Sequence, residues 1–480
     1  MPFKLLILSS STSSTKKFSV ALLHCNFLAY APKRLVLLCS SLMMGKLRLR
    51  QPYKTLSRRL GLAIANALKD LEELLLRVVY QVLRTQSLKG PVSPLLFDLS
   101  KLRVLNLSQN LLFGQPSPQV SNLKRLKMLS LGENQLSGSL PSQLGVLTWL
   151  ETLSLCSNSF TGEMPSELGD MKQLKSLDFS GNGLNGTVPI RLGELTQLQD
   201  LDLSDNLLSG SLTWNQMESL WLNNNQFVGR IPLEVGNCSM LKYIRLSNNK
   251  LSCPIPRELC DSESLVEINL DGNMLSGTVE DVFDRCTNLS QLEKLDLSSN
   301  MLTGRIPKEI GNLRSIQILK LNSNFFNGSI PMRLGDSTSL NILELGNNNL
   351  NGSIPEKIAD LAQLQFLDLS YNNLSRPILS KHSSYFHEVN IPDLSYSHNY
   401  RKFDLSYNTL SGPIPKELGS CVVVVYLLLG NNMLFSNIPK SLSRLTNLTT
   451  LDLFGNLLTG SIPPEFGDSL KLQGFYLGHN

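Results

Sequence analysis

The sequence predicts an α/β repeat fold, a curved, superhelical solenoid with a parallel β-sheet on its concave side and mostly 3₁₀ turns or loops on its convex side. The first observation is a Leu-x-Leu-x-x-Asn-x-Leu unit that recurs along most of the chain. The second is its spacing, because the marker Asn, or Gln86 in the same slot, returns after 24 residues in thirteen of sixteen steps. The third is a hydrophobic content of 42% over 480 residues, which is ample for one continuous core. A fixed period of this length indicates stacked repeats that contact only their neighbours.

The unit around Leu295, Asp296 and Leu297 shows what each position does. Alternation along a strand directs both leucines into the core and the aspartate outward onto the concave face. Asn300 lies where the chain turns inward, and its amide can pair with backbone groups that would otherwise be buried without partners. This consensus is that of the leucine-rich repeat. The predicted asparagine ladder comprises Asn110, Asn134, Asn158, Asn182, Asn206, Asn225, Asn249, Asn273, Asn300, Asn324, Asn348, Asn372, Asn408, Asn432, Asn456 and Asn480.

A Gly-x-Ile-Pro run follows many of these asparagines. Gly304 permits a tight bend, Ile306 returns to the core and Pro307 fixes φ. Ile310 and Leu313 then cover the convex side in a short 3₁₀ or helical turn. This 24-residue form resembles the plant-type leucine-rich repeats of receptor kinases and receptor-like proteins, which are extracellular. The resemblance implies a second short strand at this run and a strongly twisted superhelix.

The chain divides into three parts. Residues 1–86 carry a net charge of +11 and the remainder −6, and we expect the basic leader, 1–57, to be poorly ordered or cleaved. A secretory signal, a transit peptide and a non-native start are all open readings of this leader. Residues 58–80 have helical periodicity and are expected to form an amphipathic helix that caps the first repeat.

The third part is the solenoid, 81–480, with an insert at 376–402 inside the 36-residue step from Asn372 to Asn408. We expect the insert to bulge out and the core to resume at Phe403, in register with Leu367. The chain stops halfway through a repeat, with neither a polar capping repeat nor an apolar stretch of about 20 residues after the array. The sequence therefore predicts an ectodomain that is truncated at its C-terminus.

No catalytic signature is present in the sequence. There is no kinase Gly-rich loop, His-Arg-Asp loop, phosphate-binding Gly-Lys-Ser/Thr motif or nucleophile elbow, so we predict a protein that is not an enzyme and takes no cofactor. The three histidines of the insert do not suggest a metal site. The net negative charge of the repeat array argues against nucleic acid as a partner. The insert adds only twelve residues to one repeat, too few for a pocket that binds a small-molecule substrate.

The outward strand position four residues before each ladder asparagine is the candidate ligand-binding slot. It carries seven acids against two bases, Arg245 and Lys320, and stacking about 4.8 Å apart would make an acidic column that steers a basic ligand. The alternative is that this aspartate is a common residue of the repeat that merely meets solvent. Nearby aromatic residues would add anchors. The predicted ligand-binding residues are Asp178, Asp202, Trp221, Tyr243, Asp296, Glu344, Asp368, Tyr371, Asp404, Tyr407 and Asp452 on the concave face, and Tyr385, Phe386 and His387 in the insert.

The chain contains eight cysteines and eight Asn-x-Ser/Thr sequons. Cys238, Cys286 and Cys421 share one convex slot and are expected to be buried apolar thiols. In an oxidising compartment, Cys253 and Cys260 are the only pair close enough in sequence to suggest a disulfide. The sequon at Asn106 falls on a concave strand and is the least suited to glycosylation. Predicted glycosylation sites are Asn185, Asn237, Asn288, Asn327, Asn351, Asn373 and Asn447.

A closer resemblance, which covers about residues 79–480, is to the ectodomains of plant leucine-rich-repeat receptor kinases that specify anther and tapetum cell fate. It is carried by TQSLKGPVSP, by the segments 257–289, 385–421 and 438–453, and most of all by the insert. The resemblance implies an extracellular region at the plasma membrane, a small secreted cysteine-rich protein ligand and a co-receptor kinase. It also implies a cytoplasmic Ser/Thr kinase domain, which this chain lacks.

Some receptors of this superfamily grip a free peptide carboxylate with an Arg-x-Arg pair on a concave strand. No such pair occurs in these strands, which favours a folded protein ligand. Two alternatives remain open: a soluble, secreted inhibitor of an enzyme, as polygalacturonase-inhibiting proteins are, and a truncated receptor fragment without activity.

Overall fold

The computed structural model describes residues 86–212, 217–284, 286, 289–378, 401–421 and 423–480. It also describes two short strands near the N-terminus, β1 (Lys4–Leu8) and β2 (Val20–His24), which pair antiparallel. The rest of the leader, the predicted capping helix at 58–80, Asn288 and the insert residues Tyr385, Phe386 and His387 lie outside the described residues. Within the described part of the chain, no helix is long and apolar enough to span a membrane.

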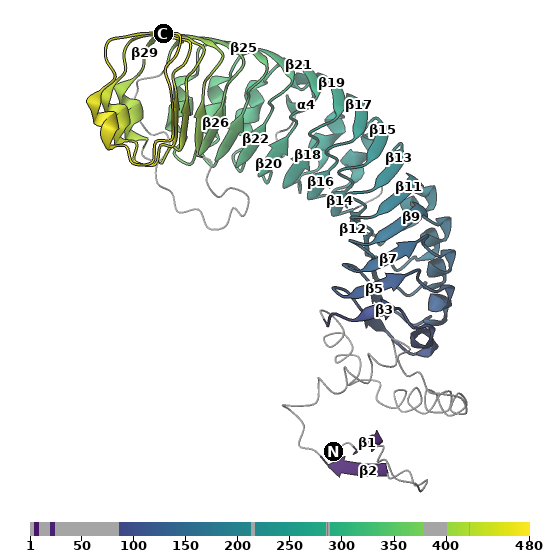
Figure 1. Ribbon diagram of the computed structural model, residues 1–480. Coiled ribbons are helices and arrows are strands. Elements are labelled where there is room, and N and C mark those ends of the chain that lie inside the picture. The colour runs from purple at the N-terminus through teal and green to yellow at the C-terminus, as the bar shows by residue number, and fades with distance from the viewer. Residues whose placement is uncertain are drawn as a thin grey trace.

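The described residues between 86 and 480 form the predicted leucine-rich-repeat solenoid, an arch built on two parallel sheets of sixteen strands each (Figure 1). The first sheet takes one three-residue strand from each repeat and lines the concave side. Its strands are β4 (Val104–Asn106), β6 (Met128–Ser130), β8 (Thr152–Ser154), β10 (Ser176–Asp178), β12 (Asp200–Asp202), β14 (Ser219–Trp221), β16 (Tyr243–Arg245), β18 (Glu267–Asn269), β20 (Lys294–Asp296), β22 (Ile318–Lys320), β24 (Ile342–Glu344), β26 (Phe366–Asp368), β28 (Lys402–Asp404), β30 (Tyr426–Leu428), β32 (Thr450–Asp452) and β34 (Gly474–Tyr476).

The second sheet is made by the residues that follow each ladder asparagine, as the plant-type resemblance implied. Its strands are β3 (Lys89–Pro91), β5 (Leu111–Gly114), β7 (Gln135–Gly138), β9 (Ser159–Glu163), β11 (Gly183–Thr187), β13 (Leu207–Gly210), β15 (Gln226–Gly229), β17 (Lys250–Pro254), β19 (Met274–Thr278), β21 (Met301–Arg305), β23 (Phe325–Ser329), β25 (Asn349–Gly352), β27 (Asn373–Pro377), β29 (Thr409–Pro413), β31 (Met433–Asn437) and β33 (Leu457–Thr459).

Short 3₁₀ turns form most of the convex side. In most repeats a proline precedes the turn with extended φ and ψ, as Pro307 does before η8, so the chain enters the turn in a fixed direction. The turns are η1 (Pro94–Asp98), η2 (Pro118–Asn122), η3 (Ser142–Val146), η4 (Ser166–Asp170), η5 (Ile190–Glu194), η6 (Leu233–Asn237), η7 (Arg257–Asp261), η8 (Lys308–Asn312), η9 (Met332–Asp336), η10 (Glu356–Asp360), η11 (Lys416–Ser420), η12 (Lys440–Arg444) and η13 (Pro464–Asp468).

A single apolar core runs through the arch between the sheets and the convex turns. Leu295 and Leu297 of one repeat are 0% and 1% exposed, and Ile306, Ile310 and Leu313 of the same repeat are also buried. Parallel register places equivalent leucines of successive repeats side by side. Each repeat therefore buries its apolar face only against its two neighbours.

The asparagine ladder joins the repeats by hydrogen bonds. The side-chain amide of Asn324 donates to the carbonyls of Leu297 (2.9 Å), Leu321 (3.2 Å) and Asn322 (3.3 Å) and accepts from the N–H of Leu302 (3.0 Å). All sixteen ladder asparagines bond the carbonyl three residues earlier in the same way. These contacts satisfy buried backbone groups of two repeats at once.

The steps of irregular length change the convex side and leave the concave sheet intact. In the step from Asn273 to Asn300 a four-residue α-helix, α4 (Glu280–Phe283), replaces the 3₁₀ turn. Across the insert, β26 pairs directly with β28, and Phe403 lies opposite Leu367 in the register expected from the sequence.

Candidate functional site

The concave sheet offers two outward positions on each strand, six and four residues before the ladder asparagine. Continuous parallel register stacks the second of these from Asn106 to Tyr476 without a break. The seven predicted acids lie in this column, and so do Trp221, Arg245 and Lys320. The prediction of one shared column therefore agrees with the geometry, although its electrostatics differ from the expectation.

Most aspartates of the column accept hydrogen bonds from the turn that follows their own strand. The Asp296 carboxylate accepts from the N–H (3.1 Å) and the hydroxyl (2.6 Å) of Ser298, two residues later. Because these bonds fix the end of the strand, the aspartate has a structural task whether or not a ligand binds. Asp296 and Asp404 are only 7% and 5% exposed, so the simple expectation that this residue meets solvent is wrong for them. The same bonds to the following serine are made by Asp178, Asp202, Asp368 and Asp404.

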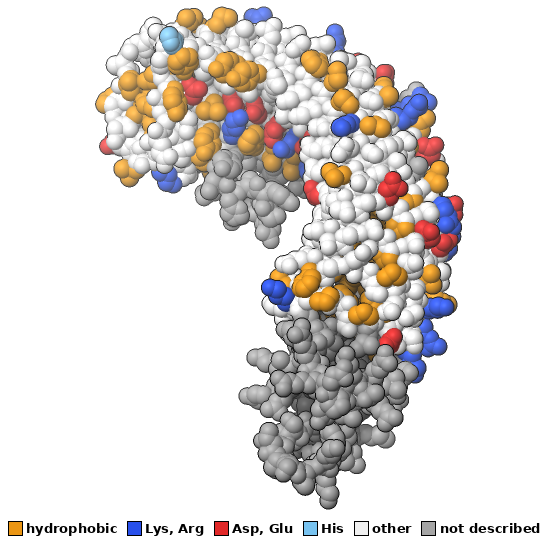
Figure 2. All heavy atoms as spheres, turned by 45° about the vertical axis from the view of Figure 1, so that its right-hand side comes forward, with side chains coloured by type: hydrophobic (Ala, Val, Ile, Leu, Met, Phe, Trp, Pro, Cys, Tyr) orange, Lys and Arg blue, Asp and Glu red, His pale blue; other side chains and the backbone are white. Residues whose placement is uncertain are grey.

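Lysines pair with three acids in the C-terminal half of the column, Glu344, Asp368 and Asp404. The Lys402 ammonium lies 2.8 Å from a carboxylate oxygen of both Asp368 and Asp404, and Lys320 lies 2.9 Å from Glu344. Burial lowers the pKa of Lys402, but its hydrogen bonds to the two aspartates outweigh that effect and raise it. Lysines and acids stand side by side on the inner side of the arch (Figure 2). A uniformly acidic column is therefore the wrong description of this half.

The count of acids and bases from the sequence missed Lys402 because it considered one outward slot. Lys402 occupies the slot two residues before Asp404 and reaches across to the column. Lys294 also occupies this first slot, where its ammonium lies 3.0 Å from Glu267 in the same slot of the neighbouring strand. Period-2 alternation places both slots on one face, so the sequence contained the signal.

The N-terminal half keeps an unpaired acidic stretch at Asp178, Asp200 and Asp202, on the adjacent strands β10 and β12. In the part of the chain that the structure describes, no ion pair joins these carboxylates to Lys or Arg. Burial raises the pKa of Asp202, hydrogen bonds from Ser204 oppose that rise, and the neighbouring Asp178 charge adds to it. A cation brought here would gain charge pairs that the protein itself does not supply.

An aromatic and ionic cluster follows on β14, β16 and β18. The Arg245 guanidinium lies 4.9 Å from the ring centre of Trp221 and 2.7 Å from the Glu267 carboxylate. Burial alone would raise the pKa of Glu267, but its pairs with Arg245 and Lys294 hold that pKa below its usual value. Tyr243 lies half-buried on the same face. The Arg245 guanidinium therefore contacts both the Trp221 ring and the Glu267 carboxylate on this face.

Tyr371 and Tyr407 meet although 36 residues separate them in the sequence. Their rings stack with centres 4.1 Å apart and planes 11° apart, and both are about half exposed. The hydrogen bond to the Tyr407 phenol raises the pKa of Tyr371. The sequence placed both on the ligand-binding surface as separate anchors, and the structure makes them one aromatic pair.

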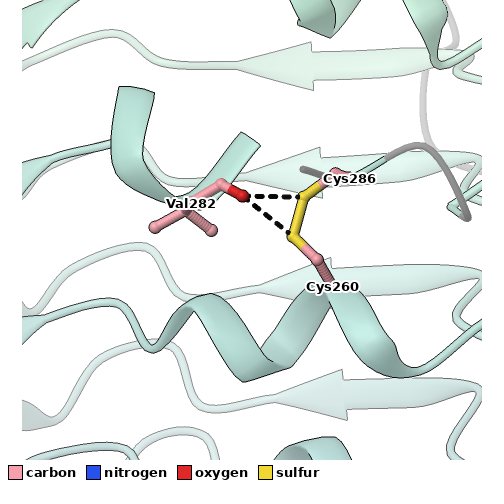
Figure 3. Close-up of a disulfide and its surroundings, with 3 residues drawn as sticks. All are labelled: Cys260, Val282 and Cys286. Atoms are coloured by element: carbon pink, nitrogen blue, oxygen red, sulfur yellow. Dashed lines mark hydrogen bonds between the residues drawn. A yellow bond between two sulfur atoms is a disulfide. The ribbon is translucent and has the colours of Figure 1, made fainter. Parts of the chain in front are cut away.

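The disulfide joins Cys260 on η7 to Cys286, just after α4, and the Val282 carbonyl lies 3.3 and 3.2 Å from the two sulfurs (Figure 3). The predicted Cys253–Cys260 pair is wrong, since Cys253 is exposed and free, and Cys286 is not the free thiol that was expected. Stacking places residues about one repeat apart next to each other, so residues 26 apart in sequence pair while residues 7 apart do not. Cys238 and Cys421 are buried, as expected.

The predicted glycosylation sites fall mostly on the second sheet. Asn185, Asn327, Asn351 and Asn373 lie exposed on β11, β23, β25 and β27, while Asn237 is exposed at the end of η6 and Asn447 is half-buried. Asn106 is 5% exposed, and its carbonyl oxygen accepts from Ser108, which fits its exclusion. Among the residues that the structure describes, no group of three or more His, Cys, Asp or Glu side chains could hold a metal ion.

Comparison with known proteins gives matches over most of the repeat array. The family described as "Leucine-rich repeat region" matches residues 83–220. The family described as "Leucine Rich Repeat" matches residues 216–238, 240–262, 291–313, 339–361, 363–383, 401–421 and 447–469. Over 67 residues the chain is 49% identical to the leucine-rich repeat receptor protein kinase EMS1 of Arabidopsis thaliana, a stretch that covers 14% of this chain and 6% of that protein.

Solved structures of plant receptor ectodomains are similar over more of the chain. The ectodomain of GASSHO1/SCHENGEN3 from Arabidopsis thaliana, in complex with CASPARIAN STRIP INTEGRITY FACTOR 2, is 33% identical with a TM-score of 0.75 and covers 81% of this chain. This chain spans 46% of it. The Arabidopsis HAESA ectodomain with an extended IDA peptide is 30% identical with a TM-score of 0.61, and 81% of this chain matches 72% of HAESA. HAESA with IDA and the co-receptor SERK1 is 28% identical with a TM-score of 0.56, over 81% and 75% of the two chains.

Proposed function

We propose, because this chain belongs to the family of plant leucine-rich-repeat receptor-kinase ectodomains, that it is the ligand-recognition region of such a receptor on the extracellular side of the plasma membrane. The observation that carries this proposal is the concave sheet, which continues across the insert in unbroken register and presents one surface over sixteen repeats. Recognition on such a surface requires no catalytic group from this chain. The HAESA ectodomain, solved with a peptide and with a co-receptor, supports the same role.

We infer that the ligand is a small secreted cysteine-rich protein, that a co-receptor kinase joins the complex, and that the signal specifies anther cell fate. This inference rests on the resemblance of the insert and its flanking segments, and the identity with the receptor protein kinase EMS1 over 67 residues supports the receptor part of it. The concave strands carry no Arg-x-Arg pair for a free peptide carboxylate. A surface that binds through several charged and aromatic side chains suits a folded protein ligand better than a linear peptide held by its terminal carboxylate.

A basic patch of the ligand docks on Asp178, Asp200 and Asp202. Among the residues that the structure describes, no Lys or Arg forms an ion pair with these acids, whereas Glu344, Asp368 and Asp404 are already paired with lysines. Charge complementarity acts mainly on the association rate, and exposed charges are screened beyond about 8 Å at physiological salt. Association should therefore slow as salt rises, and the effect should come from the N-terminal half of the column.

The test compares two isosteric variants of the secreted chain in surface plasmon resonance, with small, basic, secreted cysteine-rich plant proteins as the probes. Asp178→Asn with Asp202→Asn should slow association several-fold at low salt and flatten its salt dependence. The matched control, Glu344→Gln with Asp368→Asn, removes as many charges from paired sites and should change the rate less. Equal rates for both variants and the parent would refute the docking site.

The receptor assignment has a separate test. Absence of binding by the parent, together with inhibition of a polygalacturonase, would overturn the assignment in favour of a secreted inhibitor. Absence of both activities would leave a receptor fragment without function.

We also infer that glycans cover part of the second sheet and leave the concave face free. The four exposed sequons on this sheet all lie outside the concave column, and three of them fall on the consecutive strands β23, β25 and β27. Glycopeptide mass spectrometry of chain secreted from plant cells should find glycan at Asn327, Asn351 and Asn373. Glycan at Asn106 would contradict this arrangement, because that side chain is buried against Ser108.

A further inference from the structure

The stacked tyrosines stand on two turns that flank the insert in the sequence. Tyr371 precedes β27, and Tyr407 follows β28, so the 35 residues between them contain the whole insert. Their ring centres are 4.1 Å apart, and their side chains remain 53% and 46% exposed. A small oxidant in solvent can therefore reach both rings while each ring stays in contact with the other.

The backbone holds the two rings together independently of the rings themselves. Tyr371 donates its N–H to the Ser406 carbonyl (3.0 Å), and Asn372 donates its N–H to the Tyr407 carbonyl (3.2 Å). Ladder bonds at Asn372 and Asn408 fix the turns on which the tyrosines stand. The rings are therefore kept at contact distance by the main chain, and a bond between them requires the rings to leave the parallel stack by rotation about their side-chain bonds.

This position is unusual for tyrosine. The residue before the ladder asparagine has a positive φ in repeat after repeat, and Gly, Asn, Asp and Ser fill most of these positions. Tyr371 and Tyr407 adopt φ values of 51° and 53°. Bulky residues rarely take this conformation, and such strain persists where the surrounding structure enforces it. The repeat pattern alone does not call for tyrosine here.

We propose that Tyr371 and Tyr407 are an intramolecular dityrosine site, cross-linked when the protein meets hydrogen peroxide and a one-electron peroxidase. Each phenol loses one electron and one proton to give a phenoxyl radical. The two radicals join through a carbon–carbon bond between the ring carbons next to the hydroxyls, and each ring regains aromaticity by moving its hydrogen to oxygen. The peroxide accepts the two electrons and two protons and leaves as two water molecules, so the reaction balances.

The cross-link would covalently join the two turns that flank the insert in the sequence. The turn joined on one side precedes β27, and the turn joined on the other side follows β28. Coupling is favoured because the partners are already in contact, so a step that is normally bimolecular becomes unimolecular. The inference is independent of the proposed ligand, since it requires only the ring pair and an oxidant of this class.

The experiment treats the full chain, at low concentration, with hydrogen peroxide and a catalytic amount of plant peroxidase. Tryptic peptides 358–381 and 403–416 contain the two tyrosines. Mass spectrometry should detect them joined with the loss of two hydrogen atoms, and dityrosine fluorescence should rise without dimer formation. Unfolding in urea before oxidation should reduce this linked species at least about tenfold, because proximity is lost.

Variants separate the pair from general tyrosine reactivity. Tyr371→Phe and Tyr407→Phe keep the stacked rings and the fold but should each abolish the linked peptides. Tyr476→Phe removes a tyrosine that is 55% exposed and lies in the last strand, and it should leave the yield unchanged. The proposal is overturned if oxidation links either residue mainly to another tyrosine, or if intermolecular dityrosine forms while this pair does not.

Discussion

Three consecutive asparagines, Asn347, Asn348 and Asn349, allow the ladder to be tested within one turn. Asn347 has φ of 53° and donates to the Ser323 hydroxyl at 3.3 Å. Asn348 is the ladder residue and is 8% exposed, whereas Asn349 is exposed at the start of β25. Replacing each in turn by alanine changes the same amide into the same methyl group. Differences in stability then report the position and not the residue type.

The expected costs differ because the contacts differ. Asn348 accepts from the Phe326 N–H (3.0 Å) and donates to the carbonyls of Leu321 (3.0 Å) and Leu345 (3.1 Å). Losing the side chain leaves about three buried groups unpaired at about 1–3 kcal/mol each, so Asn348→Ala should cost about 4 kcal/mol. Asn347→Ala should cost about 1 kcal/mol because alanine tolerates positive φ poorly. Asn349→Ala should change stability by less than about 0.5 kcal/mol.

Urea unfolding followed by circular dichroism would rank the three variants of the full chain. Because long repeat arrays can unfold in sections, amide hydrogen exchange of peptides from β22 to β25 gives the local readout. Asn348→Ala should accelerate exchange there and leave distant repeats unchanged. Equal effects for Asn348→Ala and Asn349→Ala would refute the reasoning that the ladder satisfies buried backbone groups.

Three further outcomes follow from the geometry. Gly311→Ala should lower stability by about 1–3 kcal/mol in thermal unfolding, because a Cβ there would lie 2.1 Å from a backbone oxygen of the next turn, whereas Gly193→Ala meets nothing within 4 Å and should be neutral. Reducing the disulfide, which closes a 26-residue separation, should cost up to about 3 kcal/mol, measured by denaturation with and without reductant. Lys402→Met should cost about 2 kcal/mol at neutral pH. Since the pKa of Lys402 is raised, the parent should lose that stabilisation as pH rises through that pKa, and the variant should not.

The repeat architecture was predictable because its cause is periodic. The same features recur in the same order: leucines at alternate positions of the concave strand, an asparagine at each inward turn and, in many repeats, a Gly-x-Ile-Pro run. One repeat therefore predicts the next. The register of β28 against β26 followed from the same pattern although the insert separates them. Period and residue type determine the core, because each repeat packs only against its neighbours.

Contacts between outward side chains were harder to predict because they depend on reach across repeats. Lys402 bonds to Asp368, 34 residues earlier, and Cys260 bonds to Cys286, 26 residues later. Proximity in sequence does not predict side-chain contacts in a solenoid. Neighbouring side chains on one face come from successive repeats and are about one repeat length apart in the sequence. A count over both outward slots would have found the lysines, and a search at one-repeat spacing would have included the disulfide.

The ladder also explains why an insert is tolerated at this place. Asn408 donates to the Leu369 carbonyl across 39 residues at 2.9 Å, and its oxygen accepts from Leu374 at 2.9 Å, as in regular repeats. Lengthening a step from 24 to 36 residues adds only about 0.4 kcal/mol of loop-closure entropy, whereas losing one ladder side chain costs several times more. Length can therefore change between the ladder residues at little cost, while the ladder residues themselves cannot change. In this chain the steps of irregular length accordingly fall between ladder residues, and the concave sheet keeps its register.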